Sequence, residues 1–427
     1  MKKFLKNLLA IVLLFAAIDL FIWSGGVNIF KLPYFAGQPE TLGIVPEDSG
    51  TGGIAWEDME VTGEEKVDDG EPYEKVEVTG AEADKYDEYL SECFAYRTLD
   101  AEMKKAYIEV FAAMIKHKET VDMSVLDIDK LHLAFQCVMI DHPEIFYAEG
   151  YSYSQYTRGD QVTRLTFTPT YICTEEEAEM LEEEMEKVIS EILLGVSKDA
   201  DDYTKVKYVY EYLVHSTEYD MSAPDNQNIC SVFLNNRSVC QGYSKATQLL
   251  LNRMGVECTL VTGVVNTTEG HSWNLVKMDG DYYHLDTTWG DASYQSIEGE
   301  DEEWLRNLDI VNYDYFGVST SEIQKTHVID NPIELPNCTA SACNYYVREG
   351  CLLSGPDKDK LGSILSAHPI VRDGSTIVKC TDRLTYDWLM NYLITESRVF
   401  DYVESGGGSI GYAQNEDALS LTLWLDD

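Results

Sequence analysis

Cys240, His271 and Asp286 have the residue types of a nucleophile, a base and a group that orients the base, in that order along the chain. They are separated by 31 residues (271 − 240) and 15 residues (286 − 271). A thiolate can attack a carbonyl carbon once a nearby imidazole has taken its proton, and a carboxylate can hold that imidazole in place. A lone cysteine or histidine is more often an inert core residue, so the joint pattern carries the prediction of a catalytic triad.

The sequence around Cys240 predicts a helix that begins at the cysteine. The run that follows has an apolar stripe and stops at Gly255, and the stripe consists of Tyr243, Ala246, Leu250 and Met254. The positive end of the helix macrodipole would favour the reactive thiolate of Cys240.

The other two residues lie on a predicted hairpin. Residues 271–278 and 281–288 read as strands, and Asp279-Gly280 between them is a strong signal for a type I′ turn. This register pairs Met278 with Asp281 and His271 with Thr288. Asp286 would then be a same-face diagonal neighbour of His271, close enough for the two side chains to meet.

With these residues in place, the chain resembles the transglutaminase-like superfamily, a branch of the papain-like group. The matching stretches are Val239-Cys240-Gln241-Gly242-Tyr243, Gly270-His271-Ser272-Trp273-Asn274 and Tyr283-His284-Leu285-Asp286-Thr287-Thr288-Trp289. The resemblance covers residues 200–330, with 312–327 as a tail. It implies an α+β core with a helix packed on an antiparallel sheet. It also implies acyl transfer by hydrolysis or by cross-linking, with the Cys240 N–H as one oxyanion donor, although the family also contains inactive members.

Aromatic residues flank the predicted triad. Trp273, Tyr283 and Trp289 could bind substrate by lining an acyl groove, and packing in the core is an equal alternative.

The first 84 residues predict export. Lys2, Lys3 and Lys6 precede an apolar run over 8–23, so residues 1–30 are expected to be a signal peptide or a membrane anchor. Residues 37–84 hold 15 acidic and two basic residues, which predicts an acidic disordered linker over 31–84.

Three further segments are expected to fold. Residues 85–199 predict helices and a hairpin around Arg158-Gly159-Asp160, and Thr174 to Glu177 is a capping box before a long helix. Residues 200–335 are the predicted catalytic core. Residues 336–427 predict a small α+β domain that opens with a strand at 345–347, so the whole chain is of the α+β class.

Composition narrows the function. The net charge of −43 disfavours nucleic acid and anionic membranes as partners, so membrane contact is expected through the N-terminal segment alone. No nucleotide fingerprint or paired Cys-x-x-Cys spacing occurs, so neither a cofactor nor a metal is predicted. Ten cysteines in a chain that is expected to be exported indicate that disulfides could form, and the candidates are Cys338, Cys343, Cys351 and Cys380. His142 lies among apolar residues and is interpreted as structural.

The expected function is an exported or cell-surface cysteine enzyme that acts on peptide or glutamine-type amides. Hydrolysis is favoured over cross-linking, and a cell-wall peptide is one candidate substrate. The rival interpretation is a binding or scaffold protein that uses the same fold without catalysis.

Overall fold

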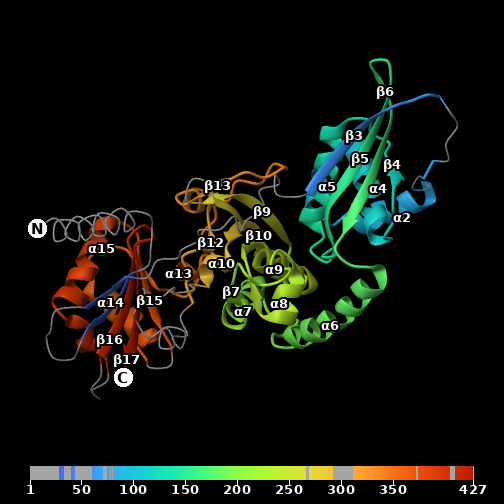
Figure 1. The fold of residues 1–427 in the computed structure, drawn as a ribbon. Coiled ribbons are helices and arrows are strands. Elements are labelled where there is room, and N and C mark those ends of the chain that lie inside the picture. Colours follow the sequence, from blue (N-terminus) through green and yellow to red (C-terminus); the bar gives the residue numbers. More distant parts are fainter. Residues whose placement is uncertain are drawn as a thin grey trace, which may run out of the picture. The chain divides into compact units, whose positions relative to one another are not determined.

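The computed structural model describes residues 28–32, 40–43, 60–70, 75–76, 78, 80–265, 269–291, 311–371, 374–403 and 409–426. They divide into two compact units. The larger is drawn from residues 50–288 and 317–340, and the smaller from residues 1–49, 289–316 and 341–427. Figure 1 shows the elements of each unit. Both units combine helices with sheets, so the chain is of the α+β class, as predicted.

Helices of the larger unit cover its sheets and are mostly amphipathic or buried. Their bounds are α2 (Gly80–Leu90), α3 (Phe94–Thr98), α4 (Ala101–Ile115), α5 (Ile128–Asp141), α6 (Glu175–Leu193), α7 (Asp202–Ser216), α8 (Ile229–Asn235), α9 (Cys240–Arg253) and α12 (Thr320–Ile323). The predicted capping box is confirmed, because the Thr174 hydroxyl accepts from the Glu177 N–H and the Glu177 carboxylate accepts in return.

One sheet of this unit has four strands in the order β3 (Glu60–Val67), β5 (Ala148–Arg158), β6 (Gln161–Tyr171) and β4 (Val121–Asp122). β5 and β6 form the predicted hairpin, with Arg158 paired to Gln161. β3 lies within the range predicted to be a disordered linker. It pairs in parallel with β5, and those backbone hydrogen bonds need no apolar side chains from β3.

The second sheet carries the candidate site. Its strand order is β12 (Phe316–Val318), β11 (Asp281–Leu285), β10 (Glu269–Met278), β9 (Cys258–Val265) and β13 (His327–Ile329). Helix α9 packs on β9 and β10, which gives the predicted arrangement of a helix against an antiparallel sheet (Figure 1). A two-residue ladder joins β7 (Glu218–Tyr219) to β8 (Arg237–Ser238) just before α9.

The division predicted between residues 199 and 200 falls inside the larger unit. The Gln248 side chain of α9 donates to the Ile140 carbonyl of α5 over 2.7 Å, so helices from both predicted segments are bonded together.

The smaller unit has a six-stranded sheet in the order β14 (Leu352–Leu353), β15 (Thr376–Cys380), β17 (Ser420–Asp426), β16 (Ser409–Asn415), β1 (Asn28–Leu32) and β2 (Glu40–Gly43). Its helical segments are α13 (Tyr345–Arg348), α14 (Lys358–Ala367), α15 (Arg383–Met390), a π turn (Asn391–Thr395) and a 3₁₀ turn (Arg398–Tyr402). β1 and β2 come from the ranges predicted as targeting segment and linker. β1 pairs with β16, and β2 pairs with β1 at the edge of the sheet.

Residues 345–347 form a helical turn, so the predicted strand there is wrong. The Tyr345 ring stacks on Tyr313 at 3.6 Å between centroids. The Tyr346 hydroxyl donates to buried Asp314 over 2.9 Å. Tyr345 and Tyr346 thus have their partners in the adjacent residues Tyr313 and Asp314. Successive side chains of a strand point to opposite faces of a sheet, so a helical turn brings both tyrosines to these partners better than a strand would.

Two other predictions concern the cysteines and the N-terminus. No disulfide joins any of the ten cysteines, all of which lie among the described residues, so the late cluster from Cys338 to Cys380 is not cross-linked here. Among the described residues, no helix has the length and apolar character needed to cross a membrane. The predicted apolar run over 8–23 lies outside those residues.

Candidate active site

Cys240 is the first residue of α9, as the sequence predicts. Val239 before it has an extended backbone, and α9 ends before Gly255, whose φ of +79° suits a glycine at a helix end. The Val239 side chain makes no capping hydrogen bond to the first turn of α9. The positive end of the helix macrodipole therefore acts on Cys240 without a capping side chain. The Cys240 residue is 0% exposed, which places the candidate nucleophile fully inside the protein.

The hairpin that carries the candidate base has the predicted turn. Met278 pairs with Asp281, and Asp279 and Gly280 have φ values of +52° and +92°, as a type I′ turn requires. The pairing predicted between His271 and Thr288 is wrong, because β11 ends at Leu285 and residues 287–290 form the short helix α10 (Thr287–Gly290). His271 instead pairs with Gly263 of β9.

Asp286 leaves the sheet and still reaches His271. The distance from His271 Nε2 to Asp286 Oδ2 is 2.8 Å, and the two side chains are 1% and 0% exposed. Burial alone would lower the pKa of His271, but the Asp286 carboxylate, helped by Cys240, raises it to about 10. Burial would raise the pKa of Asp286, and its bonds to histidine hold that pKa well below the usual range. The pair is therefore an imidazolium beside a carboxylate at neutral pH.

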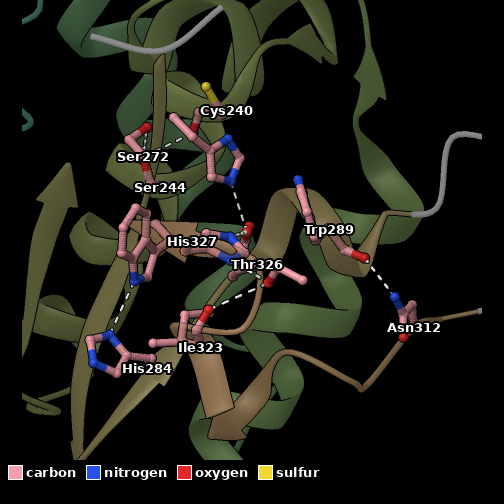
Figure 2. A network of polar contacts seen from close by, with 12 residues as sticks. Cys240, Ser244, Ser272, His284, Trp289, Asn312, Ile323, Thr326 and His327 are labelled. Carbon is pink, nitrogen blue, oxygen red and sulfur yellow. Dashed lines mark hydrogen bonds and ion pairs between the residues drawn. The ribbon is translucent and has the colours of Figure 1, made fainter. Parts of the chain in front are cut away.

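The second ring nitrogen of His271 is the one left for chemistry. Because Nε2 donates to Asp286, Nδ1 is available to exchange a proton with a thiol. Cys240 is one of the groups that raise the pKa of His271, after the Asp286 carboxylate. Figure 2 shows Cys240 at the start of its helix, with Ser244 and Ser272 beside it.

His327 is a second histidine on the same carboxylate, and no role was predicted for it from the sequence. Its Nε2 lies 3.0 Å from Asp286 Oδ2, and its Nδ1 lies 2.8 Å from the Thr326 hydroxyl (Figure 2). Burial lowers the pKa of His327, so the ring is neutral and donates from Nε2 to Asp286. Thr326 then donates to Nδ1 and fixes that tautomer. His327 lies 41 residues beyond Asp286, on a strand that no local turn signal ties to the hairpin.

Two hydroxyl pairs attach α9 to the segments that carry His271 and Asp286. The Ser244 and Ser272 hydroxyls are 2.9 Å apart, and Ser272 follows His271 directly. The Thr247 and Thr287 hydroxyls are also 2.9 Å apart, and Thr287 follows Asp286. All four residues are buried. Each member of the triad is thus next to, or one helical turn from, a buried hydrogen bond between α9 and its neighbours.

Two of the three predicted substrate-binding aromatics belong to the core. Trp273 is 0% exposed, its indole N–H donates to His284 Nδ1 over 3.1 Å, and its ring packs edge-on against His327 at 4.9 Å. Tyr283 is 1% exposed. Neither ring can line an open groove, because protein atoms cover both. Trp289 is half-buried in α10 and packs edge-on against Tyr315, so it stays a candidate for substrate contact.

The same cluster has donor atoms that suit a divalent metal ion. The ligand atoms of His271, Asp286 and His327 lie within 4.8 Å of one another, and all three residues are buried. Their hydrogen bonds of 2.8 and 3.0 Å satisfy these atoms without an ion. A metal here would occupy His271 Nε2 and separate the imidazole from Asp286.

The site is thus a buried Cys-His-Asp set on an α+β core. Residues 191–287 match the family model described as the transglutaminase-like superfamily. This part of the chain is therefore a transglutaminase-like domain.

The kyphoscoliosis peptidases of Homo sapiens and Mus musculus are each 22% identical to the chain, over 129 and 122 residues. The matches cover 26% and 25% of this chain and 19% and 18% of those proteins, so the chain spans about a fifth of these relatives. A crystal structure of a TGase is 15% identical and covers 37% of this chain and 49% of its own, with a TM-score of 0.25.

Proposed function

We propose that this protein is a cysteine-dependent acyl-transfer enzyme that hydrolyses peptide or glutamine-type amides. The observation that carries the proposal is the buried 2.8 Å bond between His271 and Asp286, with Cys240 acting on the same imidazole. A structural histidine needs one satisfied partner, whereas this one has a carboxylate on one nitrogen and a thiol near the ring.

In the proposed reaction, the Cys240 sulfur attacks the carbonyl carbon of an amide while His271 Nδ1 holds the thiol proton. The tetrahedral adduct collapses when His271 gives that proton to the leaving amine, and a thioester remains on Cys240. Water then attacks the thioester, loses a proton to His271 and releases the acid. Asp286 keeps His271 in the Nε2–H form throughout, and the Cys240 N–H is one donor to the oxyanion.

Hydrolysis is proposed over cross-linking because the chain between the nucleophile and the base is short. Only 31 residues separate Cys240 from His271 (271 − 240), which leaves little chain to exclude water from the thioester. Protein or peptide substrates, including cell-wall peptides, fit this chemistry. The net charge of −43 would attract substrates that carry lysine or arginine.

The test offers the full-length protein a glutamine-containing protein and a labelled primary amine, and measures ammonia release, amine incorporation and peptide cleavage together. Hydrolysis predicts cleavage or ammonia release without incorporation, lost in Cys240→Ala and kept in the control Cys258→Ala. Cys258 is a buried cysteine of β9 in the same sheet. Incorporation that depends on Cys240 would establish a cross-linker instead.

A second candidate function is a non-catalytic scaffold. The complete burial of Cys240 favours this function, because catalysis requires a substrate carbonyl to reach the sulfur and protein atoms cover it. An alkylating reagent small enough to enter the site separates the two. A scaffold predicts no Cys240 labelling in the folded protein, and an enzyme predicts labelling that a substrate slows.

We also propose that the protein works outside the cytoplasm. The support is the basic flank and apolar run of residues 1–30, followed by the acidic stretch over 37–84. Protease added to intact cells should then cut the chain. Protection of the chain until the cells are lysed would place it in the cytoplasm.

A further inference from the structure

A second set of cysteine, histidine and carboxylate lies in the larger unit, apart from Cys240. His142 follows the end of α5 and is 2% exposed, and its Nδ1 lies 2.7 Å from Glu144 Oε1. The opposite nitrogen, Nε2, is buried and makes no hydrogen bond within the described part of the chain. Cys93 is one of the groups that raise the pKa of this ring. The sequence had suggested a structural role for His142.

Asp141 holds Cys93 and His142 together. This buried carboxylate, at the end of α5, accepts from the Ala95 and Tyr96 N–H groups over 2.8 and 2.9 Å. Those N–H groups follow Cys93 by two and three residues, and Asp141 directly precedes His142. The chain after the thiol is therefore bonded to the chain before the imidazole. The ring itself is held against Phe111, with 4.5 Å between ring centroids.

The charges around the pair favour a proton on the imidazole. Burial alone would lower the pKa of His142, but Glu144 and then Cys93 raise it to about 10. The other titratable or charged groups near the pair include Tyr89, Tyr96, Tyr107, Asp141 and Arg253. Burial raises the pKa of Tyr107, so this neighbour stays neutral near pH 7.

Access distinguishes this thiol from the candidate nucleophile. Cys93 is half-buried, whereas Cys240 is 0% exposed. The Glu144 side chain is 43% exposed, so solvent reaches the carboxylate end of the set. Cys93 is therefore the more accessible of the two cysteines.

We propose that Cys93, His142 and Glu144 form a second reactive-thiol site, at which Cys93 exchanges with a low-molecular-weight disulfide to form a mixed disulfide. It is a modification site, independent of the chemistry proposed for Cys240. The Cys93 sulfur attacks one sulfur of the disulfide, a new S–S bond forms and the old one breaks. His142 holds the Cys93 proton during the attack and passes it to the leaving thiolate. The disulfide is reduced to one thiol as Cys93 is oxidised, so atoms and electrons balance.

Cys173 is the matched control, because Cys93 and Cys173 are the two half-buried cysteines of the chain. Burial raises the pKa of Cys173. The full-length protein is treated with 5,5′-dithiobis(2-nitrobenzoic acid) and the modified peptides are mapped over time at pH 6 to 8. Cys93 should react at least roughly tenfold faster than Cys173 at pH 7, since an ordinary thiol is only a few per cent thiolate there. Its rate should change little from pH 6 to 8.

Two variants test the roles of the partners. His142→Asn should bring the Cys93 rate down to that of Cys173 and restore a tenfold rise per pH unit. Glu144→Gln keeps a hydrogen-bonding group at a partly exposed position, so it serves if His142→Asn does not fold, and it should slow Cys93 at pH 6 more than at pH 8. Equal rates for Cys93 and Cys173, or an unchanged pH profile in both variants, would overturn the proposal. Cys240→Ala should leave the Cys93 rate unchanged, which separates this site from the proposed enzyme activity.

Discussion

Cys240 and Cys93 each lie beside a buried histidine that a carboxylate holds by its other nitrogen, but the two sites differ in depth. At the Cys240 site the carboxylate is 0% exposed and bonds a second histidine. At the Cys93 site the Glu144 carboxylate is 43% exposed and bonds His142. Burial strengthens charge pairing and fixes geometry, whereas exposure gives reagents access. The same three chemical groups can therefore serve a precise reaction in one place and an open exchange in another.

Removing the deep thiol should have the largest effect. Cys240→Ala is expected to lower amide hydrolysis by on the order of 10⁴-fold or more, since the thioester of the proposed reaction forms on the Cys240 sulfur. Its melting temperature should stay close to that of the wild type, and disulfide exchange at Cys93 should continue. Loss of Cys93 reactivity in this variant would mean that the two sites are one coupled system.

Asp286→Asn comes next, because it removes the carboxylate from two histidines at once. Activity should fall by on the order of 10³- to 10⁴-fold, since the amide no longer stabilises the imidazolium or selects its tautomer. Steady-state assays should show the loss mainly in kcat.

The same variant also tests how the His271–Asp286 pair makes the stability of the protein depend on pH. The raised pKa of His271, about 10, contributes stability that is complete below its unfolded value near 6.5 and is lost as the pH rises toward 10. The depressed pKa of Asp286 contributes stability that is lost as the pH falls below its unfolded value near 3.9. Urea unfolding should therefore show the largest difference between wild type and Asp286→Asn at about pH 4 to 6.5. A difference that grows from pH 7 to 10 would contradict the ion pair.

His327→Asn should have a moderate effect, because His327 acts through Asp286. Activity is expected to fall roughly 10- to 100-fold as the carboxylate loses one of its two supports and shifts. His284→Asn is the control, since His284 is a buried histidine of the same sheet that bonds Trp273 and Thr320. A positioning role predicts a lower kcat, an unchanged KM and a shifted pH profile for His327→Asn. Equal losses in the two variants, with unshifted profiles, would indicate a packing role alone.

Ser244→Ala should have the smallest effect. It removes the hydroxyl that lies 2.9 Å from Ser272, and a lost buried hydrogen bond typically costs about 1 kcal/mol of stability. A double-mutant cycle with Ser272→Ala measures the coupling by urea unfolding. Additive losses would show that the two hydroxyls do not support each other. Neither variant is expected to change the Cys93 exchange rate.

Local signals were enough to predict the helix at Cys240 and the hairpin turn that follows His271. An apolar stripe, a terminal glycine and an Asp-Gly turn each act within a few residues, so the sequence carries them directly. They also predicted that His271 and Asp286 would lie close together. The detail was wrong where β11 stops, because Asp286 bonds two histidines and leaves the strand pairing.

Only the tertiary structure decided which distant residues join these sites. The pairing of β13 with β9 brings His327 to Asp286. The two residues are 41 positions apart, and no local sequence signal predicts that pairing. The segments that carry Cys93 and His142 are joined because the Asp141 carboxylate accepts from the backbone that follows Cys93. Burial was also decided by the tertiary structure, since the sequence left a substrate groove and the core as alternatives for Trp273 and Tyr283, and both rings are buried. Long-range pairing and exclusion of water depend on the whole chain folding at once, whereas turns and caps depend on their immediate neighbours.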